Sequence, residues 1–189
     1  MILYLHGFRS APASTKATRL QAHMAERGLA DQFWCGQLPI APNAAIDLIE
    51  AQIARCDTAP TLVGSSLGGF YATWLAEKHG LKAIAVNPGV LSHLSLAPYV
   101  GQQTNLYTGE VFDFTEQHLA ELKALETPRI TRPERYWLMV ETGDEVLDYQ
   151  HAVAKYVGAR QTVLEGGDHS FTRWDDYLDE ILRFAGLAR

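Results

Sequence analysis

The chain has 189 residues, a net charge of −6 and a hydrophobic fraction of 47%, ordinary values for one globular domain with a sizeable core. The acidic balance and the scattered lysines and arginines argue against a nucleic-acid-binding protein. No apolar run is long enough to cross a bilayer and the first residues lack the features of a signal peptide, so we expect a cytoplasmic protein without a membrane span.

Apolar strand-like runs alternate with amphipathic helical patterns along most of the chain. In the first half the expected elements are a strand at 2–5, a helix at about 14–27, a short edge strand at 32–36, a helix from 42, a strand at 60–64, a helix that ends near 79–80 and a strand at 83–86. Asn43 is the expected N-cap of the helix that starts at Pro42-Asn43. Strands that are apolar on both faces are typical of a parallel sheet covered by helices.

The alternation is interrupted at about 88–134, where prolines and aromatic residues accompany a single expected helix near 115–126. This segment reads as an insertion at the end of a strand, where α/β folds place substrate-facing loops. The alternation resumes with a strand at 136–140, a helix around 148–157, a strand at 161–164 and a last helix whose apolar stripe begins at Trp174. The pattern predicts one α/β domain, residues 1–189, with a doubly wound, mostly parallel sheet of about six strands and a small lid-like insertion.

The two cysteines, Cys35 and Cys56, are too few for a disulfide framework. They also lack the spacing of metal ligands. We expect both to be reduced and largely buried.

The most informative motif is the run Gly64–Gly69, which follows an apolar strand and opens a helix. Its G-x-S-x-G pattern at a strand-to-helix turn is that of a nucleophile elbow. Only Ser66 fits the register, because Ser65 would need glycines at 63 and 67. The small neighbours allow the close approach of strand and helix that lifts the serine hydroxyl off the sheet.

A serine hydroxyl becomes a good nucleophile only beside a base that a third group orients. His169 is the candidate base, because it follows the strand at 161–164 and two glycines that allow a sharp turn. Asp144 follows the strand at 136–140 and is the candidate acid, and the order Ser, Asp, His is that of α/β-hydrolases. Among the other acids, Asp148 could cap the next helix, Glu145 is expected in solvent, and Asp168 is expected to cap a turn or face solvent.

The site also needs donors for an oxyanion. One is expected to be the backbone N–H of Leu67, and the other the N–H of Phe8 in the loop after the first strand, where Gly7 allows close approach. His6 has a competing claim as a base, but a structural role in shaping this loop is favoured. Arg9 could contact an anionic substrate group, although a salt bridge or solvent exposure is the simpler expectation.

Four segments, Tyr4–Phe8, Gly64–Gly69, Thr142–Tyr149 and Gly166–Phe171, resemble the α/β-hydrolase superfamily, and more closely its small bacterial YqiA-like esterases. The resemblance extends over essentially the whole chain. It implies a compact serine esterase acting on acyl esters or thioesters, with Ser66, Asp144 and His169 as its triad. Unlike larger members, the chain starts at the strand before His6-Gly7, without the usual N-terminal antiparallel strands or a large cap domain.

We therefore expect a serine esterase with a small-molecule ester or thioester substrate and no metal or organic cofactor. Two rivals are another acyl-transfer reaction on the same triad, by an amidase or acyltransferase, and a binding module that keeps the fold without catalysis. The insertion's apolar residues could form an acyl pocket or simply pack the insertion onto the sheet. They are Leu91, Leu94, Leu96, Tyr99, Tyr107, Phe112 and Phe114.

Overall fold

The computed structural model describes residues 1–188, and its central element is a sheet of six strands in the order β2-β1-β3-β4-β7-β8. Every neighbouring pair of strands is parallel, which confirms the sheet expected from the sequence. The strands are β1 (Ile2–Leu5), β2 (Phe33–Trp34), β3 (Thr61–Ser65), β4 (Lys82–Val86), β7 (Tyr136–Glu141) and β8 (Arg160–Leu164). The expected edge strand at 32–36 is therefore reduced to the two residues of β2.

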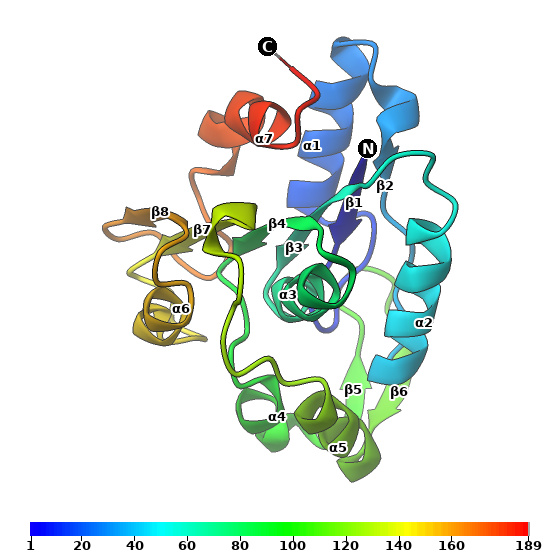
Figure 1. Ribbon diagram of the computed structural model, residues 1–189. Coiled ribbons are helices and arrows are strands. Elements are labelled where there is room, and N and C mark those ends of the chain that lie inside the picture. The colour runs from blue at the N-terminus through cyan, green and yellow to red at the C-terminus, as the bar shows by residue number, and fades with distance from the viewer. Residues whose placement is uncertain (189) are drawn as a thin grey trace.

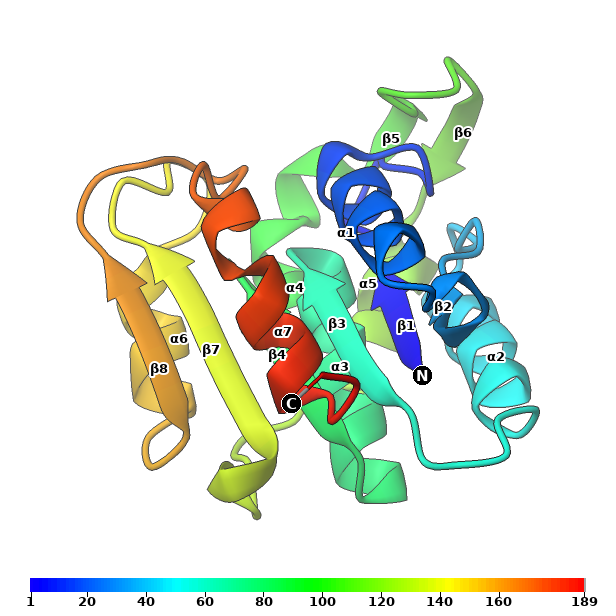
Figure 2. The same ribbon diagram turned by 90° about the horizontal axis from the view of Figure 1, so that it is seen from above.

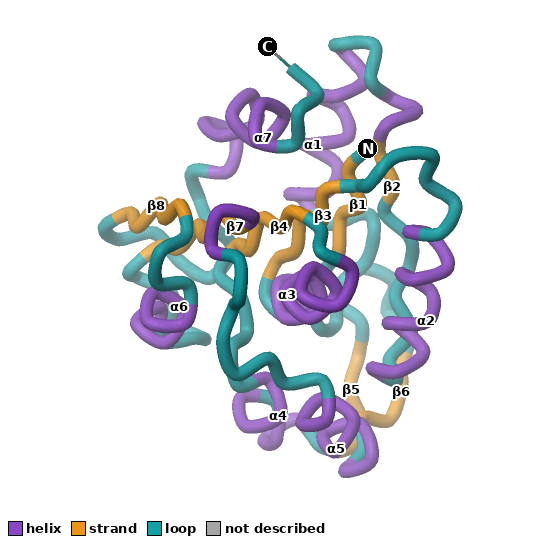
Figure 3. Tube along the Cα trace, in the orientation of Figure 1, coloured by secondary structure: helices purple, strands orange, loops and turns teal. Residues whose placement is uncertain are grey.

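Helices cover both faces of the sheet, as Figures 1 and 3 show. The main helices are α1 (Thr15–Glu26), α2 (Pro42–Ile53), α3 (Leu67–His79), α6 (Tyr149–Lys155) and α7 (Leu178–Phe184). In Figure 1, α1 and α7 lie on one side of the sheet, and α2, α3 and α6 lie on the other. The fold is thus the doubly wound α/β arrangement that the sequence predicted.

The sheet separates two apolar cores, because successive side chains of a strand point to opposite faces. In β1, Ile2 and Tyr4 belong to the core under α1 and α7. Leu3 and Leu5 belong to the core that α2, α3 and α6 cover. All four side chains are buried, so the strand has to be apolar on both faces, and its sequence shows no alternation.

The last helical segment is divided into a 3₁₀ turn, Trp174–Tyr177, and α7. Trp174 is buried, and its indole N–H donates to the Lys16 carbonyl in the first turn of α1 at 3.1 Å. The Trp174 ring also packs edge-on against Tyr4. The C-terminal segment is thereby fixed against the start of α1, next to the carboxyl end of β1.

The insertion contains more structure than the sequence predicted. The expected helix is present as α5 (Glu116–Ala124), capped by Thr115, and a short helix α4 (Ser92–Ser95) precedes it. Between them lies an antiparallel hairpin, β5 (Gly101–Thr104) and β6 (Val111–Phe114), that was not predicted. The reason is visible in β5, whose polar and largely exposed residues, Gly-Gln-Gln-Thr, show no apolar alternation.

The predicted N-cap of α2 was wrong. Ala41 is the capping residue and Pro42 is the first helical residue, so Asn43 lies inside the first turn. Proline suits this position because it has no N–H to satisfy and its φ is already helical. The Asn43 N–H donates to the Glu121 carboxylate of α5 at 3.0 Å, so a carboxylate from the insertion replaces the expected side-chain cap.

Both cysteines are free thiols, as expected, but they are only half-buried. Burial raises the pKa of Cys35 to about 12 and raises that of Cys56. Because the thiolate is the reactive form, neither residue is suited to nucleophilic chemistry.

Candidate active site

The carboxyl ends of the parallel strands lie at one edge of the sheet, and the loops that leave them gather there (Figure 2). Three of these loops carry the residues singled out in the sequence: the β3–α3 turn, the segment after β7 and the segment after β8. The insertion hairpin β5–β6 and the β1–α1 loop lie at the same edge.

Ser66 occupies the turn between β3 and α3 in a strained conformation, with φ 56° and ψ −121°. Its N–H donates to the Val86 carbonyl of β4 at 3.0 Å, which fixes the turn to the neighbouring strand. The glycines on either side are required by space, because a Cβ on Gly64 would overlap the Gly68 carbonyl and a Cβ on Gly68 would overlap the Leu5 carbonyl. The residue thus has the geometry of the predicted nucleophile elbow.

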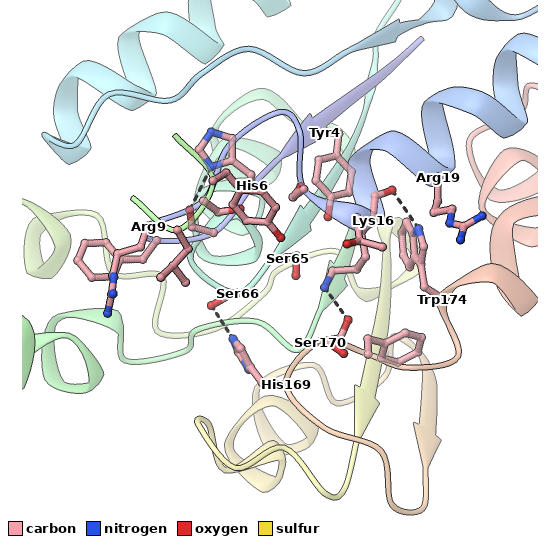
Figure 4. Close-up of a pocket in the computed structure, with 18 of the residues that line it drawn as sticks. Tyr4, His6, Arg9, Lys16, Arg19, Ser65, Ser66, His169, Ser170 and Trp174 are labelled. Carbon is pink, nitrogen blue, oxygen red and sulfur yellow. Dashed lines mark hydrogen bonds between the residues drawn. The ribbon is translucent and has the colours of Figure 1, made fainter. Parts of the chain in front are cut away.

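Ser66, His169 and Asp144 form a continuous hydrogen-bonded chain. Ser66 Oγ lies 3.0 Å from His169 Nε2, the contact drawn in Figure 4. On the other side of the ring, His169 Nδ1 lies 2.8 and 3.0 Å from the two carboxylate oxygens of Asp144. A carboxylate only accepts, so Nδ1–H donates to Asp144 and Nε2 is left to accept the serine proton.

The loop after β7 fixes the Asp144 carboxylate. Asp144 has a side-chain exposure of only 2%, and its Oδ1 accepts from the backbone N–H groups of Val146 and Leu147, both at 2.9 Å. The alternatives have other roles: Asp148 caps α6 through the Gln150 N–H, and Asp168 accepts from the Ser170 N–H at 2.7 Å, as expected of a turn cap. Of these three aspartates, only Asp144 contacts the His169 ring.

The backbone of His169 is held as firmly as its ring. Its N–H donates to the Glu145 carboxylate at 3.0 Å, so Glu145 is exposed as expected but also contacts the site. Its carbonyl accepts from Asn87 Nδ2 at 3.1 Å, and the same amide donates to the Asp168 carbonyl. Asn87 is buried at the end of β4 with φ 39°, and its Oδ1 accepts the Glu141 N–H at 3.0 Å. It therefore connects the loops that carry Asp144 and His169.

Glu141 is a fully buried carboxylate at the end of β7, directly below these loops. It accepts from the backbone N–H groups of Asp168 and Thr172 at 3.0 and 2.9 Å, and from Arg173 Nε at 2.9 Å. Burial alone would raise its pKa, but the hydrogen bonds from Thr172, Arg173 and Asp168 outweigh this effect and lower the pKa to about 2. Glu141 is thus an ionised anchor for the segment on either side of His169.

Sequence reasoning assigned no role to Glu141 or Asn87. A usable signal was present for each. Glu141 is an acid that ends an apolar buried strand, and Asn87 stands in the same position after Ala83–Val86. A polar side chain at such a position is buried and needs partners, which the neighbouring loops supply.

The β1–α1 loop lies directly against the elbow. A Cβ on Gly7 would come within 3.2 Å of Ser66 Cβ, so the main chain of this loop is in contact with the serine. Phe8 follows, and its ring packs edge-on against Tyr99, Phe112 and Phe114 of the insertion. Within residues 1–188, the N–H groups of Phe8 and Leu67 donate to no other protein atom. Neither of these two N–H groups is therefore engaged within the described part of the protein.

His6 has the structural role that the sequence favoured. It is 4% exposed, and its ring is used on both sides: Nε2 accepts the Leu38 N–H and Nδ1–H donates to the Gly7 carbonyl, both at 3.0 Å. These bonds require the neutral ring, since a protonated ring would have no acceptor for Leu38.

A pH-dependent stability follows from this arrangement. Burial lowers the pKa of His6 below its ordinary value of 6.5. As the pH falls below 6.5, the His6 ring is therefore protonated in the unfolded chain before it is protonated in the folded chain. The contribution of His6 to stability is complete above pH 6.5 and is lost as the pH falls below it, by at most about 1.4 kcal/mol per pH unit. Urea unfolding between pH 7.5 and 5 should show this slope in the wild type. The His6→Gln variant should show a smaller slope, by up to one proton, and equal slopes would contradict the assignment.

Arg9 is partly exposed and forms no salt bridge within residues 1–188. Its Nε donates to the Thr104 carbonyl at 2.9 Å, and its own carbonyl accepts the Leu106 N–H at 2.8 Å. Asn105 adds a bond from Nδ2 to the Ser10 carbonyl at 2.9 Å. The guanidinium could not be assigned from sequence because its partner belongs to the hairpin that was not predicted. These hydrogen bonds hold the hairpin β5–β6 against the β1–α1 loop, which carries the Phe8 N–H.

Two cavities meet at Ser66 and His169, which line both. The larger, of about 530 Å³, extends between the β1–α1 loop, the start of α1 and the segment after His169. The smaller, of about 200 Å³, is mainly apolar and lies under the insertion. Its lining includes Leu67, Leu96, Tyr99 and Leu147.

The insertion's apolar residues are divided between the lining of a cavity and the core. Leu96 and Tyr99 line the smaller cavity, whereas Phe114 is buried in the core and packs against Phe8. Leu94, with an exposed fraction of 59%, does neither.

The sheet order, the strained serine between β3 and α3 and the histidine loop before the last helix define an α/β-hydrolase fold. Solved structures of this fold superpose on nearly the whole chain. Alpha/beta hydrolase domain-containing protein 10 from mouse matches with a TM-score of 0.73 and 16% identity over 96% of this chain and 89% of that chain. A monoacylglycerol lipase from Paleococcus ferrophilus matches with a TM-score of 0.70 and 14% identity over 99% and 94% of the two chains.

The esterase domain of a Rhodothermus marinus protein matches with a TM-score of 0.64 and 19% identity over 97% of this chain and 85% of that chain. At these identities the likeness concerns the fold. The chain belongs to the family described as Uncharacterised protein family (UPF0227), whose model matches residues 1–186. Its fold is that of the α/β-hydrolases, as the sequence motifs implied.

Two further findings concern the described part of the chain. Within residues 1–188, no helix combines the length and apolar character needed to traverse a bilayer. Over the same residues, no three side chains of histidine, cysteine, aspartate or glutamate are grouped so that they could hold a metal ion.

Proposed function

We propose that the protein is a serine esterase that hydrolyses carboxylic esters or thioesters, with Ser66 as nucleophile, His169 as general base and acid, and Asp144 as the residue that orients His169. The observation that carries the proposal is the hydrogen-bonded chain from Ser66 Oγ through the His169 ring to the buried Asp144 carboxylate. The strained elbow supports it, because such strain is kept where it serves a reaction.

The geometry supports a two-stage reaction. Ser66 Oγ attacks the carbonyl carbon while His169 Nε2 takes its proton, and the Asp144 carboxylate stabilises the imidazolium that forms. The N–H groups of Leu67 and Phe8 then donate to the oxyanion. When the tetrahedral intermediate collapses, His169 gives the proton to the leaving oxygen or sulfur. Water attacks the acyl-enzyme in the same way and regenerates Ser66.

The compared structures add support of a general kind, since they are described as a lipase and an esterase domain of the same fold.

We further propose that residues 1–189 act as one domain, that the segment 88–134 is its lid, and that the protein works in the cytoplasm on small molecules. The same triad would also serve an amidase or an acyltransferase, and the fold alone would serve a binding module.

A serine-directed fluorophosphonate probe separates the enzyme from the binding module. We expect the wild-type chain to be labelled stoichiometrically and to hydrolyse p-nitrophenyl butyrate, and the Ser66→Ala variant to do neither. Parallel assays with an anilide and with an added alcohol acceptor distinguish the esterase from the amidase and the acyltransferase. Absence of labelling in a folded wild-type chain would overturn the proposal.

The size of the apolar cavity leads to a prediction on acyl-chain length. A volume of about 200 Å³ beside Ser66 holds only a short or medium acyl group. Across p-nitrophenyl esters of increasing chain length, and the matching acyl-CoA thioesters, kcat/KM should be highest for short to medium chains. A clear optimum at long chains would contradict this prediction.

A further inference from the structure

The larger cavity has a basic wall that the triad does not use. Three cationic side chains, Arg9, Lys16 and Arg19, line it together with the start of α1 (Figure 4). The acids on the same wall are already engaged: Glu145 accepts the His169 N–H and Asp175 lies 3.9 Å from Arg19. The lining thus holds three cationic and two acidic side chains, although the whole chain has a net charge of −6.

The start of α1 presents donors that nothing else satisfies. Ser14 is the capping residue, yet its side chain makes no capping bond, and the first turn contains no acid. Ser14 lines the cavity with an exposed fraction of 8%, and within residues 1–188 its buried hydroxyl has no hydrogen-bond partner. A buried hydroxyl without a partner is costly. The N-terminus of the twelve-residue helix α1 therefore combines unused backbone N–H groups, the positive end of the helix dipole and the unpartnered Ser14 hydroxyl.

Lys16 extends the same feature. Its Nζ donates to the Ser170 carbonyl at 2.6 Å, and it has no carboxylate within 4.0 Å in the described part of the chain. Burial lowers the pKa of Lys16 to about 8, and the nearby Asp168, Glu141 and Asp144 oppose this effect, so the side chain is mostly cationic at pH 7. A cation held on a neutral carbonyl keeps its charge available for a ligand.

The two cavities differ in the cationic side chains that line them, because Arg9 lines both whereas Lys16 and Arg19 line only the larger one. The acyl group stays on Ser66 after the first stage, so it suits the small apolar cavity. The leaving group departs and water takes its place, so it suits the larger cavity, whose lining includes Lys16 and Ser14.

We propose that the larger cavity is a subsite for an anionic group, a carboxylate or a phosphate, on the leaving group of the ester, bound by the start of α1, the Ser14 hydroxyl and Lys16. This inference rests on the proposed esterase function and names its substrate class. Cleavage of the ester bond releases an alcohol that still carries the anionic group. His169 donates the proton to the oxygen of this alcohol, and the acyl group stays on Ser66 until water removes it.

The test uses three acetate esters that share the acyl group: 4-acetoxybenzoate, 4-acetoxyphenyl phosphate and the uncharged methyl 4-acetoxybenzoate. The quantity measured is the ratio of kcat/KM for each anionic ester to kcat/KM for the neutral ester. Each ratio is compared between variants, because the intrinsic reactivity of the leaving groups is the same for every variant. Lys16→Met should lower at least one ratio about tenfold or more, since a hydrogen bond to a charged group is lost. Ser14→Ala should lower the same ratio by about threefold or more.

The anionic ester with the larger drop identifies the anion as carboxylate or phosphate. Lys123→Met is the matched control, because Lys123 is exposed on α5, does not line either cavity, and its loss changes the net charge equally. Its ratios should equal those of the wild type. Ser14→Ala also removes a hydroxyl without a partner, so it tests the subsite even if Lys16→Met fails to fold.

Two results would overturn the inference and leave the esterase standing: ratios unchanged in Ser14→Ala and Lys16→Met, or an equal loss on all three esters, which would show that Lys16 only positions the Ser170 segment. If the wild-type chain hydrolyses none of the three esters, the proposed function fails, and the subsite fails with it.

Discussion

The Ser66→Ala variant is expected to hydrolyse esters on the order of 10⁴-fold more slowly than the wild-type chain. The hydroxyl is the group that would form the acyl-enzyme, and no nearby side chain replaces it in the bond to His169 Nε2 at 3.0 Å. His169→Ala should cause a loss of similar size, because the hydroxyl is a poor nucleophile without its base. Steady-state kinetics with p-nitrophenyl butyrate measures both.

The double variant gives the sharper result. Residues that act as one unit have non-additive effects, so Ser66→Ala combined with His169→Ala should be no slower than either single variant within a few fold. Thermal unfolding serves as the control, because neither side chain belongs to the apolar core and both variants should fold. Activity losses that multiply, or a Ser66→Ala variant with more than a tenth of the wild-type rate, would contradict the triad.

Glu141→Gln should lower both stability and activity, although Glu141 does not touch the substrate site. The substitution keeps the shape of the side chain but removes the charge opposite Arg173 and turns an NH₂ group toward backbone donors. Loss of one partner in a buried, hydrogen-bonded charge network costs about 3 kcal/mol of unfolding free energy. The His169 loop loses its anchor at the Asp168 N–H, so kcat should fall by about tenfold or more in the fraction that remains folded.

The matched control is Glu26→Gln, since Glu26 has a side-chain exposure of 75% and lies far along α1. It should change the unfolding free energy by less than about 0.5 kcal/mol and leave kcat unchanged. Equal effects of the two substitutions on unfolding in urea would contradict the role assigned to Glu141.

Acid unfolding gives an independent view of the same carboxylate. The folded pKa of Glu141, about 2, lies below its ordinary value of 4.5, so its stabilising contribution is complete above pH 4.5 and is lost as the pH falls toward 2. The wild-type chain should therefore lose more stability than Glu141→Gln between pH 5 and 3. Parallel stability curves over that range would contradict the lowered pKa.

Much of the fold was predictable because the buried strands and the helices carry their own patterns. The strand Ile2–Leu5 is apolar at every position, which only a sheet covered on both faces requires. The elbow was predictable because its steric demands select glycine at 64 and 68. Its candidate partners could be found because they follow strands that end at the same edge.

The features that were missed depend on contacts between distant segments. The hairpin β5–β6 is polar and exposed, and it is held at the site by bonds to Arg9 and Ser10 that lie 95 positions away in sequence. The N-cap of α2 was misassigned to Asn43, whose N–H donates to a carboxylate from the distant Glu121 of the insertion. Glu141 and Asn87 acquire their roles only when β4, β7 and the His169 loop meet. The residues that neighbour such a side chain in sequence do not indicate which distant groups it will contact.

The most direct test of the central claim is to identify the residue that carries the acyl group. Rapid acid quenching of the wild-type chain with p-nitrophenyl acetate, followed by peptide mass mapping, should place an acetyl group of 42 Da on Ser66. The neighbouring Ser65, which lines the same cavity, serves as the internal control and should remain unmodified. An acetyl group on Ser66 within one turnover is the result that the account predicts. Turnover with the label on Ser65, on another residue or on none would contradict it.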